Sequence, residues 1–149
     1  MKYYLIIMLV IGCDQLTKWL IVSNMHLSET IPLIENVLHI TYIRNTGAAF
    51  SFFAGHTTAL GVFTAILVAA GLVFIYVKRK TGQKLMMMAV SLIIGGGAGN
   101  LIDRAAYGYV VDFIDFRVFP VFNVADICVT VGCALLCISI LKSESGKNA

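Results

Sequence analysis

The chain has 149 residues, of which 59% are hydrophobic and only 13% are charged. A soluble globular protein usually has about a quarter of its residues charged. The composition therefore excludes an ordinary soluble domain and predicts an integral membrane protein, most simply one membrane-embedded domain over residues 1–149. The net charge of +3 is small, and without a concentrated basic face we expect no nucleic-acid partner.

Four stretches are apolar over the length that crosses a bilayer. A hydrocarbon core of about 30 Å needs about 20 helical residues. The stretch ALGVFTAILVAAGLVFIYV, which begins at Ala59, contains no charged residue. We predict an all-α membrane protein with four transmembrane helices at about residues 3–22, 59–77, 85–102 and 121–141.

Basic residues mark one end of these predicted helices. They lie before the first helix, between the second and third, and after the fourth: Lys2, Lys78, Arg79, Lys80, Lys84, Lys142 and Lys147. Because positive charge marks the cytoplasmic side, both termini are predicted to be cytoplasmic. The connections at about residues 23–58 and 103–120 are then extracytoplasmic.

The first of these outer connections has the pattern of a β-strand. In Val37–Ile43, Leu38, Ile40 and Tyr42 alternate with more polar residues. We expect a small extracytoplasmic sheet between the first and second helices. The run Asn45-Thr46-Gly47-Ala48-Ala49 follows, in which glycine permits a tight turn and the alanines permit close approach of another chain.

The third predicted helix contains a cluster of small residues. Gly95, Gly96, Gly97, Ala98 and Gly99 precede Asn100. Small residues let transmembrane helices approach one another closely, so we expect this helix to pack tightly against its neighbours.

The aspartates are the unusual feature of so apolar a chain. A carboxylate at the centre of a membrane helix costs about 2.5–3.5 kcal/mol on insertion scales, so acids in such a setting indicate function. Asp14 lies one helical turn before Lys18, where an ion pair can form, and a buried structural pair would also explain these two residues. The other four crowd the stretch between the last two helices: Asp103, Asp112, Asp115 and Asp126.

The cysteines and histidines show no metal-binding pattern. All four cysteines lie in apolar helix, and we interpret them as small buried hydrophobic residues and not as zinc ligands or disulfides. His26, His39 and His56 fall in the first outer connection and are interpreted as surface residues. No pairing of serine or cysteine with histidine indicates a nucleophile. We predict no metal and no cofactor.

The first helix also has the appearance of an export signal. Lys2, an apolar run and Gly12-Cys13 are similar to the signal of a lipoprotein, in which the cysteine is modified with lipid. Hydrophobicity resumes at Trp19, however, and three further spans follow. This segment is therefore interpreted as a transmembrane helix.

Paired carboxylates can hydrolyse a peptide bond without a metal. Two acids a few ångströms apart do not both ionise readily, so they share a proton. The ionised acid then accepts a proton from water as it attacks a carbonyl, while its protonated partner polarises that carbonyl and later protonates the leaving amine. The cluster of acids is suited to this chemistry.

Five segments together resemble the bacterial lipoprotein signal peptidases, or signal peptidase II. In chain order they are Asp14-Gln15-x-x-Lys18, Arg44-Asn45-Thr46-Gly47-Ala48-Ala49-Phe50, Gly99-Asn100-Leu101-Ile102-Asp103-Arg104, Val110-Val111-Asp112-Phe113-Ile114-Asp115 and Phe122-Asn123-Val124-Ala125-Asp126. The resemblance implies an aspartic endopeptidase of the bacterial cytoplasmic membrane. Such an enzyme removes the signal peptide from prolipoproteins, cutting before the cysteine that carries diacylglyceryl, so its partners are lipidated prolipoprotein and membrane lipid.

The resemblance also implies roles for individual residues. It places the two catalytic acids at Asp112 and Asp126 and leaves Asp115 structural or surface-exposed. Because these positions complete a site within one chain, we expect a monomer. The supporting or substrate-binding positions are Asp14, Lys18, Asn45, Gly47, Asn100, Asp103, Arg104, Asn123 and Ala125.

Two other functions are compatible with the hydrophobic spans. A small proton-coupled transporter could use Asp14, Asp112 or Asp126 as a relay. However, four of the five aspartates lie at one side of the predicted membrane, and the second and third spans have no acid near their middle. A structural scaffold would leave the costly acids without a purpose.

Overall fold

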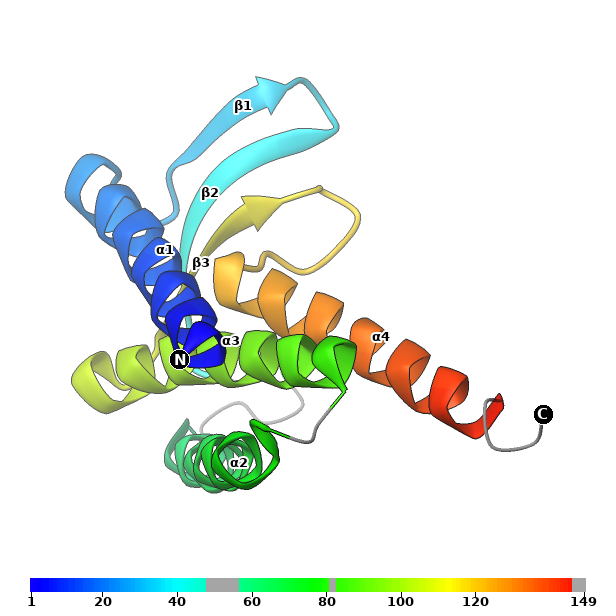
Figure 1. The fold of residues 1–149 in the computed structure, drawn as a ribbon. Helices are drawn as coiled ribbons and strands as arrows, with labels where there is room; N and C mark the ends of the chain where they lie inside the picture. The colour runs from blue at the N-terminus through cyan, green and yellow to red at the C-terminus, as the bar shows by residue number, and fades with distance from the viewer. Residues whose placement is uncertain (48–56, 81–82, 146–149) are drawn as a thin grey trace.

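The computed structural model describes residues 1–47, 57–80 and 83–145, with the side chains of residues 144 and 145 excepted. The elements in these ranges are, in chain order, α1 (Lys2–Asn24), β1 (Thr30–Ile34), β2 (Leu38–Asn45), α2 (Thr57–Lys78), α3 (Lys84–Tyr107), β3 (Val110–Asp115) and α4 (Val124–Ser145) (Figure 1). Each of the four helices is long and apolar enough to cross a membrane. The predicted fold class is confirmed.

Helix α3 lies at the centre of the bundle, with α2 on one side and α1 and α4 on the other (Figure 1). Its run of glycines makes this position possible. A Cβ atom at Gly95 would lie 2.7 Å from the side chain of Val10 in α1. Gly96 lies directly against the backbone of α4, and Gly97 lies against Val68 of α2. Three consecutive glycines therefore each contact a different helix.

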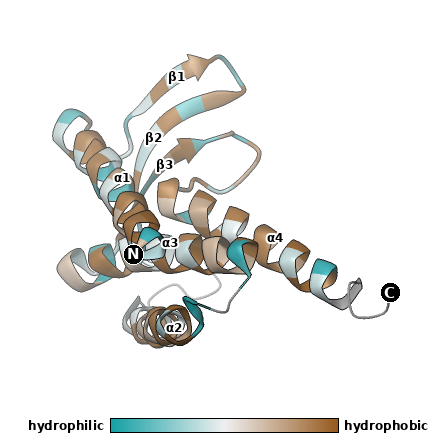
Figure 2. Cartoon of the chain, in the orientation of Figure 1, coloured by the Kyte–Doolittle hydropathy of each residue, from teal (hydrophilic) through white to brown (hydrophobic). Residues whose placement is uncertain are grey.

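Figure 2 shows that hydrophobic residues predominate along the helices, and many of their large side chains are exposed on the protein surface. In α2 the one fully buried residue is Ile75, whereas Phe63 and Val73 are about 60% exposed on the protein surface. The interpretation of the cysteines as buried residues was wrong: Cys13, Cys133 and Cys137 are exposed and Cys128 is half-buried, all as free thiols. A membrane protein can place small apolar residues outward, because lipid covers these faces.

The three strands form an antiparallel sheet in the order β1-β2-β3. The predicted strand in the first connection is present as β2. It is the central strand, and its neighbouring residues Thr41 and Tyr42 are both buried. The partner on one side, β3, comes from the connection between α3 and α4, and Ile43 of β2 pairs with Asp112. Each helix begins or ends next to a strand at one end of the bundle, which we call the sheet end.

Two predicted boundaries were wrong, and both concern the last connection. Helix α3 continues to Tyr107, so Asp103 and Arg104 lie inside the helix and not in a loop. Arginine and alanine favour helix at these positions, and Gly108 ends it with a φ of 76°, donating its N–H to the carbonyl of Arg104 at 3.0 Å. Helix α4 begins only at Val124.

Candidate active site

Asp112 and Asp126 come from different elements and line one cavity at the sheet end. Asp112 lies in the middle of β3 and is buried, whereas Asp126 is half-buried in the first turn of α4. The cavity has a volume of about 310 Å³, and Asn45, Asn100 and Arg104 also line it. Two helices, α3 and α4, and the sheet thus contribute side chains to one cavity that contains both acids.

Three asparagines hold the two carboxylates. The side-chain amide of Asn45 donates to Oδ2 of Asp112 at 2.9 Å, and that of Asn123 donates to its Oδ1 at 2.6 Å. Asp126 accepts from the amide of Asn100 at 2.8 Å and from the backbone N–H of Asn123 at 3.2 Å. Each of the four carboxylate oxygens therefore accepts one N–H, which fixes both acids and leaves lone pairs for a proton or a water molecule.

Two further carboxylates hold the backbone next to these acids. Asp103 accepts from the N–H of Val111 at 3.0 Å, and Asp14 accepts from the N–H of Ala125 at 3.0 Å. Val111 and Ala125 each immediately precede one of the two cavity acids. Asp14 and Asp103 themselves are fully buried. The same arrangement thus occurs twice, with a buried aspartate supporting the peptide before each acid.

Lys18 joins the two halves of this arrangement. Its ammonium group lies 2.9 Å from Asp14 and 3.0 Å from Asp103, and it donates to the side-chain oxygen of Asn100 at 2.9 Å. An ammonium has three N–H donors, so three contacts account for all of them. The predicted pair of Asp14 and Lys18 is present, but it is part of a larger buried network.

Gln15 also belongs to this network, although we did not place it among the site residues. Its amide donates to Asp103 at 2.9 Å and to the carbonyl of Gly99 at 3.2 Å. Gly99 lies so close to Asp14 that a Cβ atom there would be 3.0 Å from the carboxyl carbon. The place of Gln15 between Asp14 and Lys18 in the sequence motif was the signal that could have indicated this role.

Burial changes the acidity of Asp112. Desolvation raises its pKa to about 7, an effect that hydrogen bonds from Asn45 and Asn123 oppose and that the nearby charge of Asp126 reinforces. The positive charge of Lys18 also opposes it. A carboxyl group with such a pKa can hold a proton near neutral pH, as catalysis by two acids that share one proton requires.

Arg104 borders the cavity with few partners of its own. Its terminal nitrogens lie 3.5 Å from the carbonyl oxygens of Asn100 and Gly47, the limit of a hydrogen bond. Its Nε is buried without a hydrogen-bond partner in the described ranges. The guanidinium can therefore donate to an additional acceptor.

Asp115 is buried but lies outside the group of residues that line the cavity. It accepts from the Thr41 hydroxyl at 2.7 Å and from the backbone N–H of Arg117 at 2.7 Å, and it forms an ion pair with the Arg117 side chain at 3.1 Å. Burial raises the pKa of Asp115, but these bonds outweigh it and hold the pKa below its usual value. Of the two predicted alternatives, the structural one fits this environment.

Comparison with known proteins supports the same function as the geometry. Residues 6–142 match the family model described as signal peptidase (SPase) II. The chain belongs to this family. It is 47% identical over 152 residues to the lipoprotein signal peptidase of Bacillus velezensis, which covers 99% of this chain and 98% of the relative. It is 45% identical over 153 residues to that of Bacillus subtilis, with 99% and 97% covered.

A solved structure extends this similarity to the fold. It is described as a bacterial membrane enzyme at 2.3 Å resolution, and its TM-score against this chain is 0.89. The two sequences are 38% identical, and the match covers 98% of this chain and 91% of the solved chain. Family membership decides between the peptidase and the transporter that the sequence left open. This multi-pass membrane protein has four candidate spans.

The structure brings together all the catalytic and supporting residues that the sequence selected. Every one of them lies within the described ranges, and all contact the cavity or the Lys18 network. The motif residues Ala48, Ala49 and Phe50 and the predicted surface residue His56 lie outside the described residues. Among the described residues, no three His, Cys, Asp or Glu side chains are grouped as metal ligands would be.

Proposed function

We propose that Asp112 and Asp126 are the catalytic acids with which this chain, a lipoprotein signal peptidase, cleaves prolipoproteins. Family membership makes it an aspartic protease that processes these substrates. One observation carries the assignment of the acids: Asp112 and Asp126 line the same cavity, whereas the carboxylates of Asp14 and Asp103 accept backbone N–H groups from behind it.

The pair would work as a unit that holds one proton. The ionised carboxylate accepts a proton from water as the water oxygen attacks the carbonyl carbon of the scissile peptide bond. The protonated acid donates its proton to the carbonyl oxygen, which gives a tetrahedral diol. When the C–N bond breaks, the protonated acid gives its proton to the leaving nitrogen, and the other carboxylate takes a proton from a diol hydroxyl as the new carboxyl group forms, so the pair again holds one proton. Arg104 and the asparagines orient the substrate and the acids.

The position of the cavity supports the choice of substrate. It lies where the ends of the helices meet the sheet, so a signal peptide can remain in the bilayer while its cleavage site reaches the acids. The basic residues at the opposite helix ends favour an extracytoplasmic sheet end and cytoplasmic termini. Because all the residues that line the cavity come from one chain, we propose that this chain acts as a single domain and as a monomer, in contact with membrane lipid.

The test uses purified protein in detergent and a synthetic prolipoprotein with or without diacylglyceryl on its cysteine. We expect cleavage of the lipidated substrate only, measured by mass as release of the signal peptide. Asp112→Asn and Asp126→Asn should each lower kcat by about 10²- to 10⁴-fold. Asp115→Asn is the matched control and should retain far more activity. Full activity in either of the first two variants would refute the assignment.

A further inference from the structure

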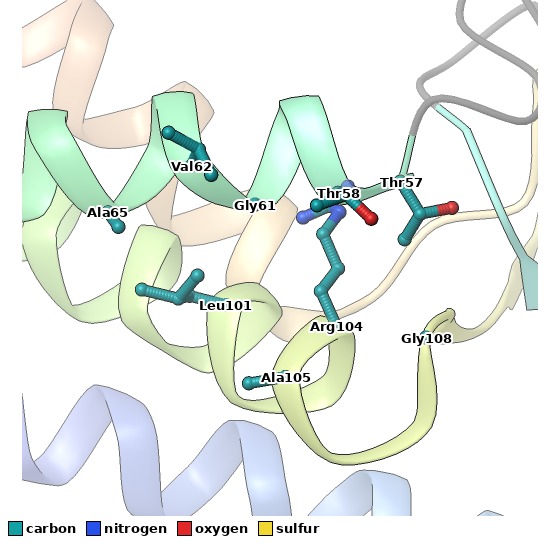
Figure 3. Close-up of a pocket in the computed structure, with 9 residues that line it drawn as sticks. All are labelled: Thr57, Thr58, Gly61, Val62, Ala65, Leu101, Arg104, Ala105 and Gly108. Carbon is teal, nitrogen blue, oxygen red and sulfur yellow. The ribbon is translucent and has the colours of Figure 1, made fainter.

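A groove beside the acid cavity runs between the sheet ends of α2 and α3 (Figure 3). It has a volume of about 520 Å³. Its walls are mainly small or apolar: Gly61, Val62 and Ala65 of α2, and Leu101, Arg104 and Ala105 of α3. Val62 is 57% exposed, so the groove is open to the surroundings of the helices. Both α2 and α3 are long and apolar enough to cross a membrane, so lipid can reach the groove from the side.

Arg104 connects this groove to the acid cavity. Figure 3 shows its side chain extending from α3 toward the start of α2. The same residue lines the cavity that contains Asp112 and Asp126. Gly61 of α2 faces it, and a Cβ atom there would lie 4.0 Å from the aliphatic carbons of Arg104, at ordinary van der Waals distance. A ligand in the groove and a peptide at the acids would therefore meet at this arginine.

The donors of Arg104 define what the groove can bind. Two of its nitrogens have only 3.5 Å contacts, its Nε has no hydrogen-bond partner, and in the described residues it forms none of the ion pairs. A guanidinium carries five N–H donors. An apolar groove that ends in unused donors suits a ligand with a hydrocarbon chain and an acceptor oxygen at its end. An ester-linked acyl chain has both.

We propose that this groove binds an acyl chain of the diacylglyceryl group of the substrate, with Arg104 donating to its ester carbonyl oxygen. The proposal rests on the proposed function, because only a lipidated prolipoprotein carries this group. The modified cysteine directly follows the scissile bond. When that bond lies between the acids, the glyceryl group is within a few bonds of the cavity that Arg104 borders.

A third cavity, lined by both Asp126 and Arg104, gives the direction in which the signal peptide would leave the acids. It has a volume of about 220 Å³, lies between α2, α3 and α4, and reaches Asp126 directly along Gly97 and Asn100. The substrate has two apolar parts, a helix and the acyl chains, and they must leave the cleavage site in different directions. The groove between α2 and α3 provides the second direction.

The first test is a matched pair of substitutions in α3. Ala105 lines the groove, whereas its neighbour Ala106 is also exposed but is not among the groove residues. We expect Ala105→Phe to fill the groove and lower kcat/KM by about tenfold or more for a dipalmitoyl substrate, chiefly through KM. The same variant should cleave a diacetyl substrate like the wild type, and Ala106→Phe should cleave both normally. Ala65→Phe would fill the groove from α2 and should repeat the result.

Several outcomes would overturn the proposal. Normal cleavage of the dipalmitoyl substrate by both groove variants would show that the acyl chains lie elsewhere. An equal loss on both substrates would show that the groove binds the signal peptide or supports the fold. If the wild type itself failed to cleave either substrate, the proposed function would be at fault and not the groove.

A second test does not depend on activity. Protein with Asp112→Asn is mixed with a prolipoprotein whose acyl chain carries a photoactivatable diazirine. We expect cross-links within residues 57–65 and 101–108, unchanged by an excess of ordinary phospholipid. Cross-links confined to α1 or α4 would refute the acyl site. Their loss with excess phospholipid would show that bulk lipid and not the substrate occupies the groove.

Discussion

Gly99→Ala tests whether the buried network sets the position of the acids. The added Cβ atom would lie 3.0 Å from the carboxyl carbon of Asp14 and closer still to one of its oxygens. Carbon atoms pack at about 3.5–4.0 Å, so the carboxylate must move by roughly 0.5 to 1 Å. That carboxylate accepts the N–H of Ala125, next to Asp126, at 3.0 Å. The shift should therefore reach Asp126, one of the two proposed catalytic acids.

The expected effects on stability and activity differ in size. Overpacking costs about 1–3 kcal/mol of unfolding free energy, and the helix propensity gained on replacing glycine offsets about 1 kcal/mol of it. The protein should remain folded. A displacement of about 1 Å at a reacting group can lower the rate by about 10²-fold, so kcat should fall much further than stability suggests.

Gly12→Ala is the matched control in a neighbouring helix, because no atom lies within 4 Å of a Cβ atom built there. It gains the same helix propensity without a clash. Both variants are assayed for signal-peptide release from lipidated substrate and for thermal unfolding. If Gly99→Ala were folded and its kcat equalled that of Gly12→Ala, the network would not position the acids and the reasoning would be wrong.

Three further predictions follow from the same contacts. Lys18→Met leaves two buried carboxylates without their shared cation and should cost about 3–5 kcal/mol of unfolding free energy; an unchanged melting temperature would contradict this. Asp115→Asn should lower stability by about 1 kcal/mol or more with little change in kcat, and its effect should shrink at acidic pH because the folded protein holds the pKa of Asp115 below its usual value. In the folded protein the pKa of Asp112 is about 7, whereas in the unfolded chain Asp112 ionises at its usual, lower pKa. Between these two pKa values only the unfolded chain loses the proton, so the unfolding free energy should fall as the pH rises. Denaturant titrations from pH 4 to 8 should show a shallower slope for Asp112→Asn, and wild-type kcat should decline above about pH 7 as the shared proton is lost.

Much of this arrangement could be predicted from the sequence because it depends on local properties. The four helices follow from apolar stretches of the right length, and the contacts of Gly95–Gly97 follow from the absence of side chains there. The acids and asparagines could be selected because polar residues are rare in such a chain and occur in a family motif. The sheet was predicted only from the alternation in β2.

The third strand could not be predicted in this way. Residues Val110 to Phe113 are all buried, so β3 shows no alternation of exposed and buried side chains. Its pairing with β2 joins Ile43 to Asp112 across a long stretch of chain that includes two transmembrane helices. Pairing between such distant segments depends on where the helices place their ends, which composition and periodicity do not report.

The sequence by itself determined that this is a membrane protein with four spans, that its acids gather near one end, and which family it resembles. Only the tertiary structure decided what each polar group does. Asp14 accepts the backbone N–H of Ala125 and Asp103 accepts that of Val111, each next to a cavity acid. Lys18 forms an ion pair with both of these aspartates. The physical reason is that a buried charge is stable only where its partners converge, and here these partners come from α1, α3, β3 and α4, which meet only in the folded chain.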